Sequence, residues 1–274
     1  MPTCQLSHPF AATSFRIISN DRDLLTSLQI LYPYTFFQGK SEIVITAINN
    51  AGTYSISHSA QLIETKSPIQ VIGNIIFEET VYVSSLLPLH AGAIEKEGVA
   101  YIFLAATGGG KTTLIAYLSE SKYRYITDDM TFINLENRNV QVTPLPLHLR
   151  PESISILAKY GYPISGTEIA IENIHRIVYT PKITSFRELP IGGIFFIKRS
   201  DAENRCESIP KTEAVQLLMQ NLMNGDAVNG ASLKCAIKLA DKCCHRLIYS
   251  DMRYVADIMD IANIREYKGT HEHT

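Results

Sequence analysis

A glycine-rich stretch at residues 101–113 constrains this chain more than any other feature. It reads Tyr-Ile-Phe-Leu-Ala-Ala-Thr-Gly-Gly-Gly-Lys-Thr-Thr. The apolar run before the glycines is typical of a buried strand, and the residues after them favour a helix. Aligned with the pattern Gly-x-x-x-x-Gly-Lys-Ser/Thr, the chain has Ala105 at the first glycine and Gly110, Lys111 and Thr112 in place. The stretch therefore predicts a strand, a phosphate-binding loop and a helix, in that order.

The loop residues have the chemistry that a polyphosphate requires. Glycines let successive backbone N–H groups turn inward around an anion, and the N-terminus of the following helix is electropositive. Lys111 is expected to reach the β- and γ-phosphates, and Thr112 to offer its hydroxyl to Mg²⁺. The predicted nucleotide-binding residues are Thr107, Gly108, Gly109, Gly110, Lys111, Thr112 and Thr113. The alternative is a glycine-rich turn before an ordinary helix.

Two carboxylates follow the next predicted strand, residues 123–127. They belong to Asp128 and Asp129. A carboxylate pair beside a phosphate loop suits Mg²⁺ coordination or removal of a proton, and like charges this close should raise one of the two pKa values. We therefore predict a metal site of Thr112, Asp128 and Asp129. A solvated turn or a helix cap is the alternative for the pair.

Candidate residues also lie on either side of these motifs. His90 starts a predicted strand, 90–94, that runs antiparallel to the strand 99–104 of the loop. A lone histidine is more often structural than functional. Downstream, Arg150 is a candidate for neutralising the charge of a transferred phosphoryl group, and Glu152 is a weaker candidate metal ligand. A surface or capping role is the alternative for Arg150.

Taken together, His90-Ala-Gly-Ala, the loop 105–112 and Asp128-Asp129 resemble the C-terminal catalytic domain of HPr kinase/phosphorylase and its relatives. The resemblance covers residues 87–260, with specific motifs only in its first part. It implies a kinase core related to phosphoenolpyruvate carboxykinase. It also implies that Asp128 is the base or acid for phosphoryl transfer to a serine and that His90 sits beside it and sets its protonation state.

The chain departs from HPr kinases in two regions. The glycine-rich stretch that follows the aspartates in that family is not visible at residues 144–152, and residues 1–86 look unlike the regulatory domain. These differences weaken the case for HPr itself as the acceptor and for the reverse phosphorolysis. Stand-alone proteins of this kind resemble kinases that tailor ribosomally made peptides, such as the lasso-peptide kinases, which phosphorylate a C-terminal serine.

The predicted architecture is α/β, with a mixed-sheet P-loop kinase core and a small N-terminal α+β domain. We place the small domain at residues 1–86 and the catalytic domain at residues 87–274. A role in presenting the acceptor to the catalytic domain is expected for the small domain. Within the first domain, Asn20 is the expected N-cap of a helix. The strands 42–48 and 53–58 flank an Asn-Asn-Ala-Gly hairpin signal.

Composition excludes several other classes. The chain has 25 basic and 27 acidic side chains and a pI near 6.4. It therefore lacks the excess of positive charge that is typical of proteins that bind nucleic acid or an acidic membrane. No apolar run is long enough to span a bilayer, and we expect no signal peptide. The five cysteines lack paired ligand spacing, which favours free thiols in the cytoplasm. Basic residues such as Arg176 and Arg199 alternate with acidic ones. This pattern predicts a solvated face, and a surface that docks the acceptor is the second interpretation.

The sequence therefore predicts a kinase that uses ATP, or another nucleoside triphosphate, and Mg²⁺. Its acceptor is expected to be a hydroxyl, with serine favoured, of a peptide or protein substrate. A nucleotide-gated regulatory module and a kinase for a small-molecule hydroxyl are the alternatives. HPr-kinase relatives are often oligomeric, which leaves a homo-oligomer open.

Overall fold

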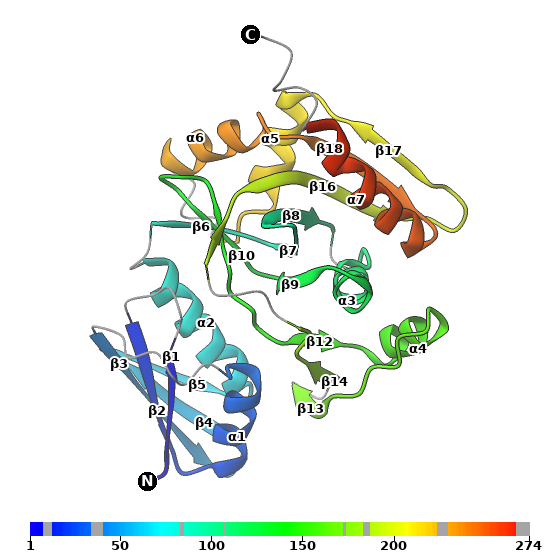
Figure 1. Ribbon diagram of the computed structural model, residues 1–274. Helices are drawn as coiled ribbons and strands as arrows, with labels where there is room; N and C mark the ends of the chain where they lie inside the picture. The colour runs from blue at the N-terminus through cyan, green and yellow to red at the C-terminus, as the bar shows by residue number, and fades with distance from the viewer. Residues whose placement is uncertain are drawn as a thin grey trace.

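The computed structural model describes residues 1–7, 13–33, 41–82, 85–106, 108–171, 174–182, 187–223 and 230–266. Within these residues the chain forms four β-sheets and seven helices (Figure 1). The predicted mixed α/β class is confirmed. Among the same residues, no helix combines the length and the apolar character needed to cross a membrane.

The first part of the chain forms a five-stranded sheet in the order β1-β2-β3-β4-β5. Its strands are β1 (Thr3–Ser7), β2 (Thr13–Ser19), β3 (Ser41–Asn50), β4 (Thr53–His58) and β5 (Gln61–Thr65). β2 and β3 are parallel and the other pairs are antiparallel. The helices α1 (Arg22–Leu31) and α2 (Pro68–Tyr82) pack apolar side chains against one face (Figure 1). The hairpin between β3 and β4 is confirmed, whereas β1 and β5 were not expected.

The start of α1 corrects one prediction. Asp21, not Asn20, is the N-cap, and its Oδ1 accepts the backbone N–H groups of Asp23 at 2.9 Å and Leu24 at 3.1 Å. The Asn20 side chain instead exchanges hydrogen bonds of 2.8 and 3.0 Å with the backbone of Asn49 in β3. The cap falls one residue later because the Asn20 amide is used to join neighbouring strands.

The largest sheet has six strands in the order β17-β18-β16-β8-β7-β9. They are β17 (Arg205–Ser208), β18 (Cys244–Tyr249), β16 (Ile191–Arg199), β8 (Val99–Leu104), β7 (Ala91–Lys96) and β9 (Arg124–Thr127). β8, β16 and β18 are parallel, and β17, β7 and β9 are antiparallel to their neighbours. The predicted antiparallel pairing of the loop's strand with the strand after His90 is confirmed.

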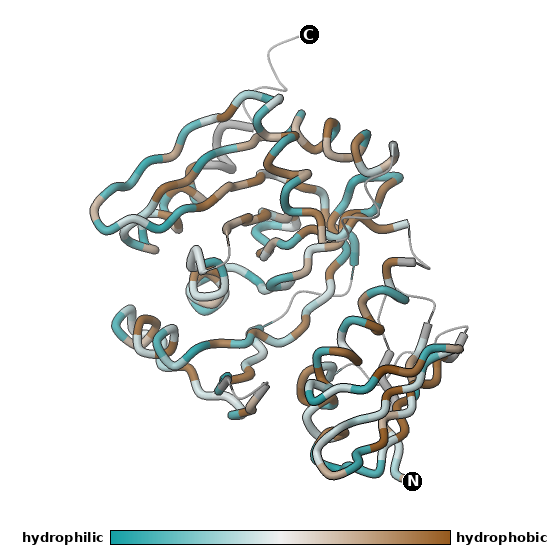
Figure 2. Tube along the Cα trace, turned by 180° about the vertical axis from the view of Figure 1, so that it is seen from behind, coloured by the Kyte–Doolittle hydropathy of each residue, from teal (hydrophilic) through white to brown (hydrophobic). Residues whose placement is uncertain are grey.

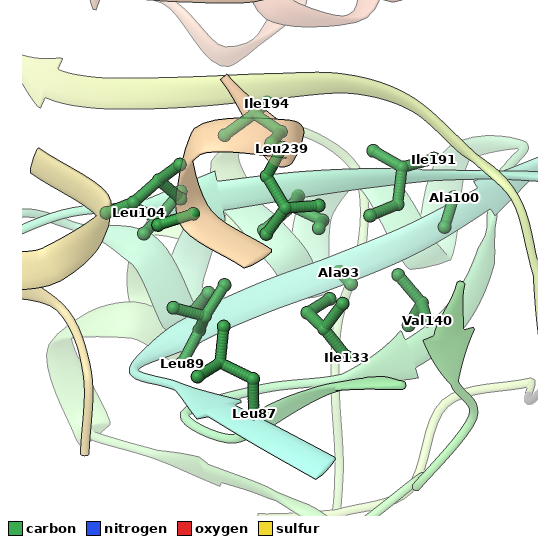
Figure 3. Close-up of a cluster of buried hydrophobic side chains, with 14 of the residues drawn as sticks. Leu87, Leu89, Ala93, Ala100, Leu104, Ile133, Val140, Ile191, Ile194 and Leu239 are labelled. Carbon is green, nitrogen blue, oxygen red and sulfur yellow. The ribbon is translucent and has the colours of Figure 1, made fainter. Parts of the chain in front are cut away.

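Two apolar cores cover the two faces of this sheet because side chains alternate along each strand. On β8, Ile102 and Leu104 face the core that includes α5 (Lys211–Gln220) and α6 (Gly230–Leu239) (Figure 3). Tyr101 and Phe103 face the core that includes α3 (Lys111–Ser121), α4 (Pro151–Lys159) and α7 (Met252–Glu266). The central strands are brown in Figure 2, while the outer β17 region is largely teal.

Two smaller antiparallel sheets complete the fold. One contains β15 (Glu188–Leu189), β11 (Val140–Gln141), β10 (Thr131–Asn134) and β6 (Leu86–Leu89), and the other contains β12 (Leu147–Leu149), β14 (Ile174–Tyr179) and β13 (Thr167–Ile171). Leu31 of α1 packs with Ile169 and Val178 of the three-stranded sheet. β6 and β12–β15 were not predicted from the sequence. The proposed domain limits of 1–86 and 87–274 stay a prediction.

Candidate functional site

The six-stranded sheet brings the predicted site residues to one edge. Ala91, the first residue of β7, pairs with Leu104, the last residue of β8. Thr127, the last residue of β9, pairs with Ala93 of β7, two residues after Ala91. His90 comes just before the start of β7, and Asp128 comes just after the end of β9. Both of these strand ends lie beside the end of β8, where the glycine-rich loop begins. The strand order explains why residues far apart in the sequence meet where β8 opens into the loop.

The glycine-rich loop leads into α3 through residues with unusual backbone angles. Gly108 and Gly110 have φ angles of +78° and +87°, the left-handed region that glycine adopts without strain. The backbone N–H of Gly109 donates to the carbonyl oxygen of Ala106 at 2.8 Å. Gly110 is the N-cap of α3, and no side chain among the described residues caps this start. The first N–H groups of α3 therefore suit an anion. Thr107 lies outside the described residues.

Lys111 lies at the start of α3 between the two predicted carboxylates. Its ammonium donates to Asp128 Oδ1 at 3.1 Å and also to Asp129 Oδ1. Only 3% of the Asp128 side chain is exposed, compared with 56% for Asp129. The Thr112 side chain is also hydrogen-bonded to Asp128. An ammonium has three N–H donors, and these two carboxylates use two of them, which leaves one for a phosphate oxygen.

The two aspartates have opposite pKa shifts. Burial, followed by the charge of Asp129, raises the pKa of Asp128 above its ordinary value, against the pull of Lys111. Partial burial also acts to raise the pKa of Asp129, but the Lys111 ammonium and its hydrogen bond outweigh it and lower this pKa. The charges of His90 and His148 act on Asp129 in the same direction as Lys111. Asp128 is thus the better proton acceptor of the pair.

A tight turn holds both carboxylates after β9. The backbone N–H of Met130 donates to the carbonyl oxygen of Asp128 at 2.8 Å. Asp129 has a φ of +63°, in the left-handed region that aspartate tolerates better than most residues. The unusual conformation turns Asp129 outward while Asp128 stays buried, so neighbouring residues have different environments.

Gly92 explains why the segment after His90 contains a glycine. A Cβ atom at this position would lie 2.6 Å from Ile115 Cγ1 of α3 and 3.1 Å from Asp128 Oδ1. Such contacts are too short for a larger side chain. The glycine therefore permits α3 to pack closely on β7 and leaves room for the Asp128 carboxylate.

A first cavity, of about 630 Å³, lies in front of the loop. The predicted residues that line it are His90, Gly108, Gly109, Gly110, Lys111, Thr112, Thr113, Asp129, Arg150 and Glu152. His148, Ser153, Arg176 and Arg199 line it as well. The structure thus brings most of the predicted site together and adds four polar residues that sequence reasoning did not assign to it.

The first cavity has a positive lining although the whole chain has a net charge of −2. Its described lining includes Lys111 and three arginines, Arg150, Arg176 and Arg199, against two carboxylates, those of Asp129 and Glu152. Arg176 and Arg199 had been expected on a solvated face. Arg199 ends β16, which is parallel to β8, so its position at a strand end was a usable signal. Arg176 lies in β14, a strand that the sequence did not predict.

The hydroxyl of Thr113 has a structural contact. Its Oγ1 lies 2.9 Å from the Oγ of Ser153 in α4. This hydrogen bond joins α3 to the helix that follows Arg150 and contains Glu152. Thr113 therefore helps to position Glu152 of α4, and Arg150 just before this helix, at the cavity.

The donor set fits a magnesium ion that a nucleotide helps to bind. Among the described residues, no group of three or more His, Cys, Asp or Glu side chains is placed to hold a metal. The Thr112 hydroxyl and the two aspartates supply oxygen atoms, which Mg²⁺ prefers, and this ion usually completes its shell with water and phosphate oxygens. None of the five cysteines forms a disulfide, and of the adjacent pair Cys243 is exposed and Cys244 is buried.

No protein-family model and no curated protein matches this chain. Among solved structures, the chain is similar to the Hpr(Ser) kinase/phosphatase from Coxiella burnetii, with 11% identity and a TM-score of 0.32. The match covers 66% of this chain and 97% of that chain. The likeness is a distant one of structure, and the functional case depends on the site itself.

Proposed function

We propose that this protein is a kinase that transfers the γ-phosphoryl group of ATP, or of another nucleoside triphosphate, to a hydroxyl of a peptide or protein, with serine as the favoured acceptor. One observation carries the proposal. The start of α3, which no described side chain caps, opens into a positively lined cavity, and Lys111 at that start contacts Asp128 and Asp129. This contact directly links a candidate phosphate site to a candidate proton acceptor.

The first cavity would bind the triphosphate. Backbone N–H groups of residues 108–112 and the Lys111 ammonium would hold the phosphate oxygens. Arg150, Arg176 and Arg199 line the same cavity and would neutralise charge on the transferred group. Thr112 and Asp129, with Asp128, would hold Mg²⁺, which supplies further charge neutralisation at the β- and γ-phosphates.

Asp128 has the environment of a proton acceptor in this transfer. The acceptor oxygen forms a new bond to the γ-phosphorus as the bond from phosphorus to the β–γ bridging oxygen breaks, and the nucleoside diphosphate leaves with that electron pair. The hydroxyl proton moves to the Asp128 carboxylate, whose pKa is raised by burial. Lys111 and the buried surroundings hold this carboxylate in place.

The substitution Asp128→Asn tests the proposal. It keeps the shape of the side chain but removes the proton acceptor, so we expect phosphoryl transfer to fall by about 10²- to 10⁴-fold while nucleotide affinity stays within a few-fold. Transfer is measured with γ-labelled ATP and serine-containing peptides, and affinity by nucleotide titration. The matched control is Asp241→Asn, which removes an exposed carboxylate paired with Lys211.

Two outcomes contradict parts of the proposal. Near-normal product formation by Asp128→Asn excludes Asp128 as the base. A wild-type protein that binds ATP but leaves the label on the nucleotide with every hydroxyl acceptor is a nucleotide-gated module instead of a kinase. Label on free amino acids or sugars, but not on peptides, indicates a small-molecule kinase.

A further inference from the structure

A second cavity, of about 640 Å³, adjoins the first. His90, Asp129 and His148 line both cavities. Asp128 lines the second cavity, whereas no described residue of the glycine-rich loop does. The buried carboxylate thus borders the second cavity, whereas the phosphate-binding loop borders the first. A group bound in the second cavity would meet the phosphoryl group at the residues that the cavities share.

One wall of the second cavity is α2, which lies between the five-stranded sheet and the rest of the chain (Figure 1). Ile72 and Ile76 on one side of this helix are buried in the core of that sheet. Gln70, Asn74 and Glu78, spaced one turn apart, are exposed and line the cavity. The polar stripe of α2 therefore faces the aspartates across the cavity.

The two cavities differ in charge and polarity. Four cationic side chains line the first, whereas no Lys or Arg occurs among the described residues that line the second. Glu78 adds a negative charge, and Phe77, Met130, Leu145 and Met223 add apolar surface. A second polyphosphate would find no cation of this kind there. An uncharged or cationic group with an apolar part matches the lining, and the volume is in the range of sites that bury a drug-sized ligand.

We propose that the second cavity is the acceptor site and that it binds a peptide segment whose hydroxyl-bearing residue is flanked by apolar or basic residues, not acidic ones. The inference rests on the proposed kinase function. The flanking side chain packs on Phe77 and Met130, and the hydroxyl reaches Asp128, which takes its proton as the phosphoryl group arrives from the first cavity. The polar stripe of α2 then acts as a specificity surface.

The first arm of the test varies the acceptor. The probes are three short peptides, each with one serine flanked by leucine and phenylalanine, by lysine or by glutamate, and free serine as a fourth probe. We expect kcat/KM for the apolar and lysine peptides to exceed that for the glutamate peptide and for free serine by at least about tenfold, or roughly 1.4 kcal/mol. Equal or better use of the glutamate peptide or of free serine overturns the inference.

The second arm varies α2. Asn74→Trp fills the cavity and Glu78→Lys reverses its charge, and both positions are exposed on the helix. Matched controls are Leu62→Trp and Glu64→Lys, at exposed positions of β5 that line neither cavity. We expect Asn74→Trp to raise the KM of the apolar peptide at least about tenfold without changing nucleotide affinity. Glu78→Lys should remove the use of the lysine peptide and improve that of the glutamate peptide.

The possible outcomes distinguish a failure of the proposed acceptor site from a failure of the proposed kinase function. Transfer to peptides with KM values that neither α2 variant changes overturns the acceptor site and leaves the kinase proposal standing. Nucleotide binding without transfer to any of the four acceptors contradicts the kinase proposal, and the inference falls with it. Thermal unfolding of each variant identifies a loss of fold, and Glu78→Lys provides the result if the tryptophan variant does not fold.

Discussion

Two helices in this chain begin in opposite ways. At α1, the Asp21 carboxylate accepts the first N–H groups and also accepts hydrogen bonds from the Asn49 amide at 3.1 Å and the Tyr54 hydroxyl. At α3, Gly110 stands at the N-cap, and no described side chain caps the helix. The positive end of α1 is neutralised by the protein's own anion, whereas that of α3 remains open to another one.

The same difference separates two aspartates. The hydrogen bond from Tyr54 is the largest influence on Asp21 and lowers its pKa, with help from the backbone N–H groups and Asn49. Burial raises the pKa of Asp128. A carboxylate whose hydrogen bonds are satisfied stabilises the fold, whereas one that is buried near a cation at a cavity is suited to proton transfer. Substitutions at the two helix starts should therefore affect different measurements.

The largest expected effect is that of Lys111→Ala on nucleotide binding. The change removes the cation at the open helix start and leaves Asp128 and Asp129 without their ion-pair partner. We expect nucleotide affinity to fall by about 100-fold or more, or roughly 2.7 kcal/mol, with loss of transfer. Titration with a fluorescent nucleotide analogue measures the change.

Lys211→Ala is the matched control. Lys211 is also the first residue of a helix, α5, and also pairs with an aspartate, Asp241, but both side chains are exposed. This variant should bind nucleotide like the wild type. If Lys111→Ala also retains normal affinity, the start of α3 is not the phosphate site.

A glycine pair tests whether the loop backbone itself binds phosphate. Gly110 and Gly52 have similar φ angles, +87° and +91°. A Cβ atom at Gly110 would lie 3.0 Å from the Tyr249 hydroxyl, and one at Gly52 would meet no described atom within 4 Å. Alanine should cost about 1–2 kcal/mol of folding stability at either position because left-handed backbone is strained with a side chain.

The two variants should differ in binding. Gly110→Ala alters the turn that presents the first N–H groups of α3, so we expect nucleotide affinity to fall about tenfold. Gly52→Ala lies in the β3–β4 hairpin and should leave affinity unchanged. Chemical denaturation and nucleotide titration give the two readings, and equal affinities for both variants would contradict a backbone role for the loop.

A smaller effect is expected from Asp21→Ala, and on stability alone. Loss of an N-cap carboxylate should lower the free energy of unfolding by about 1–2 kcal/mol. Nucleotide affinity should not change, because the α1 cap lies outside the first cavity. Asp23→Ala is the control, since Asp23 lies in the first turn of α1 but is not the cap, and it should cost less. A loss of nucleotide affinity in Asp21→Ala would contradict the separation of the two helix starts.

The strands and helices with strong local patterns could be predicted from the sequence. The apolar run of β8, the glycines and α3 all have local signals, and so does the hairpin of β3 and β4. In the three-stranded sheet, β12 pairs with β14, which is distant in sequence, so this pairing had no local signal. β13 and β14 are only two residues apart, and their local pattern was missed. The N-cap of α1 was misplaced by one residue because the contact of Asn20 with Asn49 is also non-local.

The candidate site was predictable where function depends on local chemistry. Lys111 could be predicted from the glycine-rich loop pattern, and Asp128 and Asp129 from the pair of carboxylates at the end of a predicted strand. His148 and Arg176 could not be, because neither lies in a motif and only the packing of β12 and β14 brings them to the cavity. The opposite pKa shifts of the aspartates also needed the structure, since they depend on which carboxylate is buried.

The smallest expected effect is a pH dependence of stability that comes from Asp21. Its pKa in the folded protein is below the ordinary value of 3.8, so the folded state holds this proton less tightly than the unfolded state. The stabilisation is therefore complete above the ordinary pKa and is lost as pH falls through the lower, folded-state pKa.

Asp21→Asn keeps a capping side chain but removes this titration. We expect the difference in the free energy of unfolding between wild type and Asp21→Asn to be constant near neutral pH and to shrink as pH falls below about 4. Urea denaturation at a series of pH values measures that difference. Because other carboxylates titrate in both proteins, they cancel in it. A difference that grows as pH falls would mean that the Asp21 carboxylate is destabilised by folding, and the contrast between the closed start of α1 and the open start of α3 would lose its electrostatic basis.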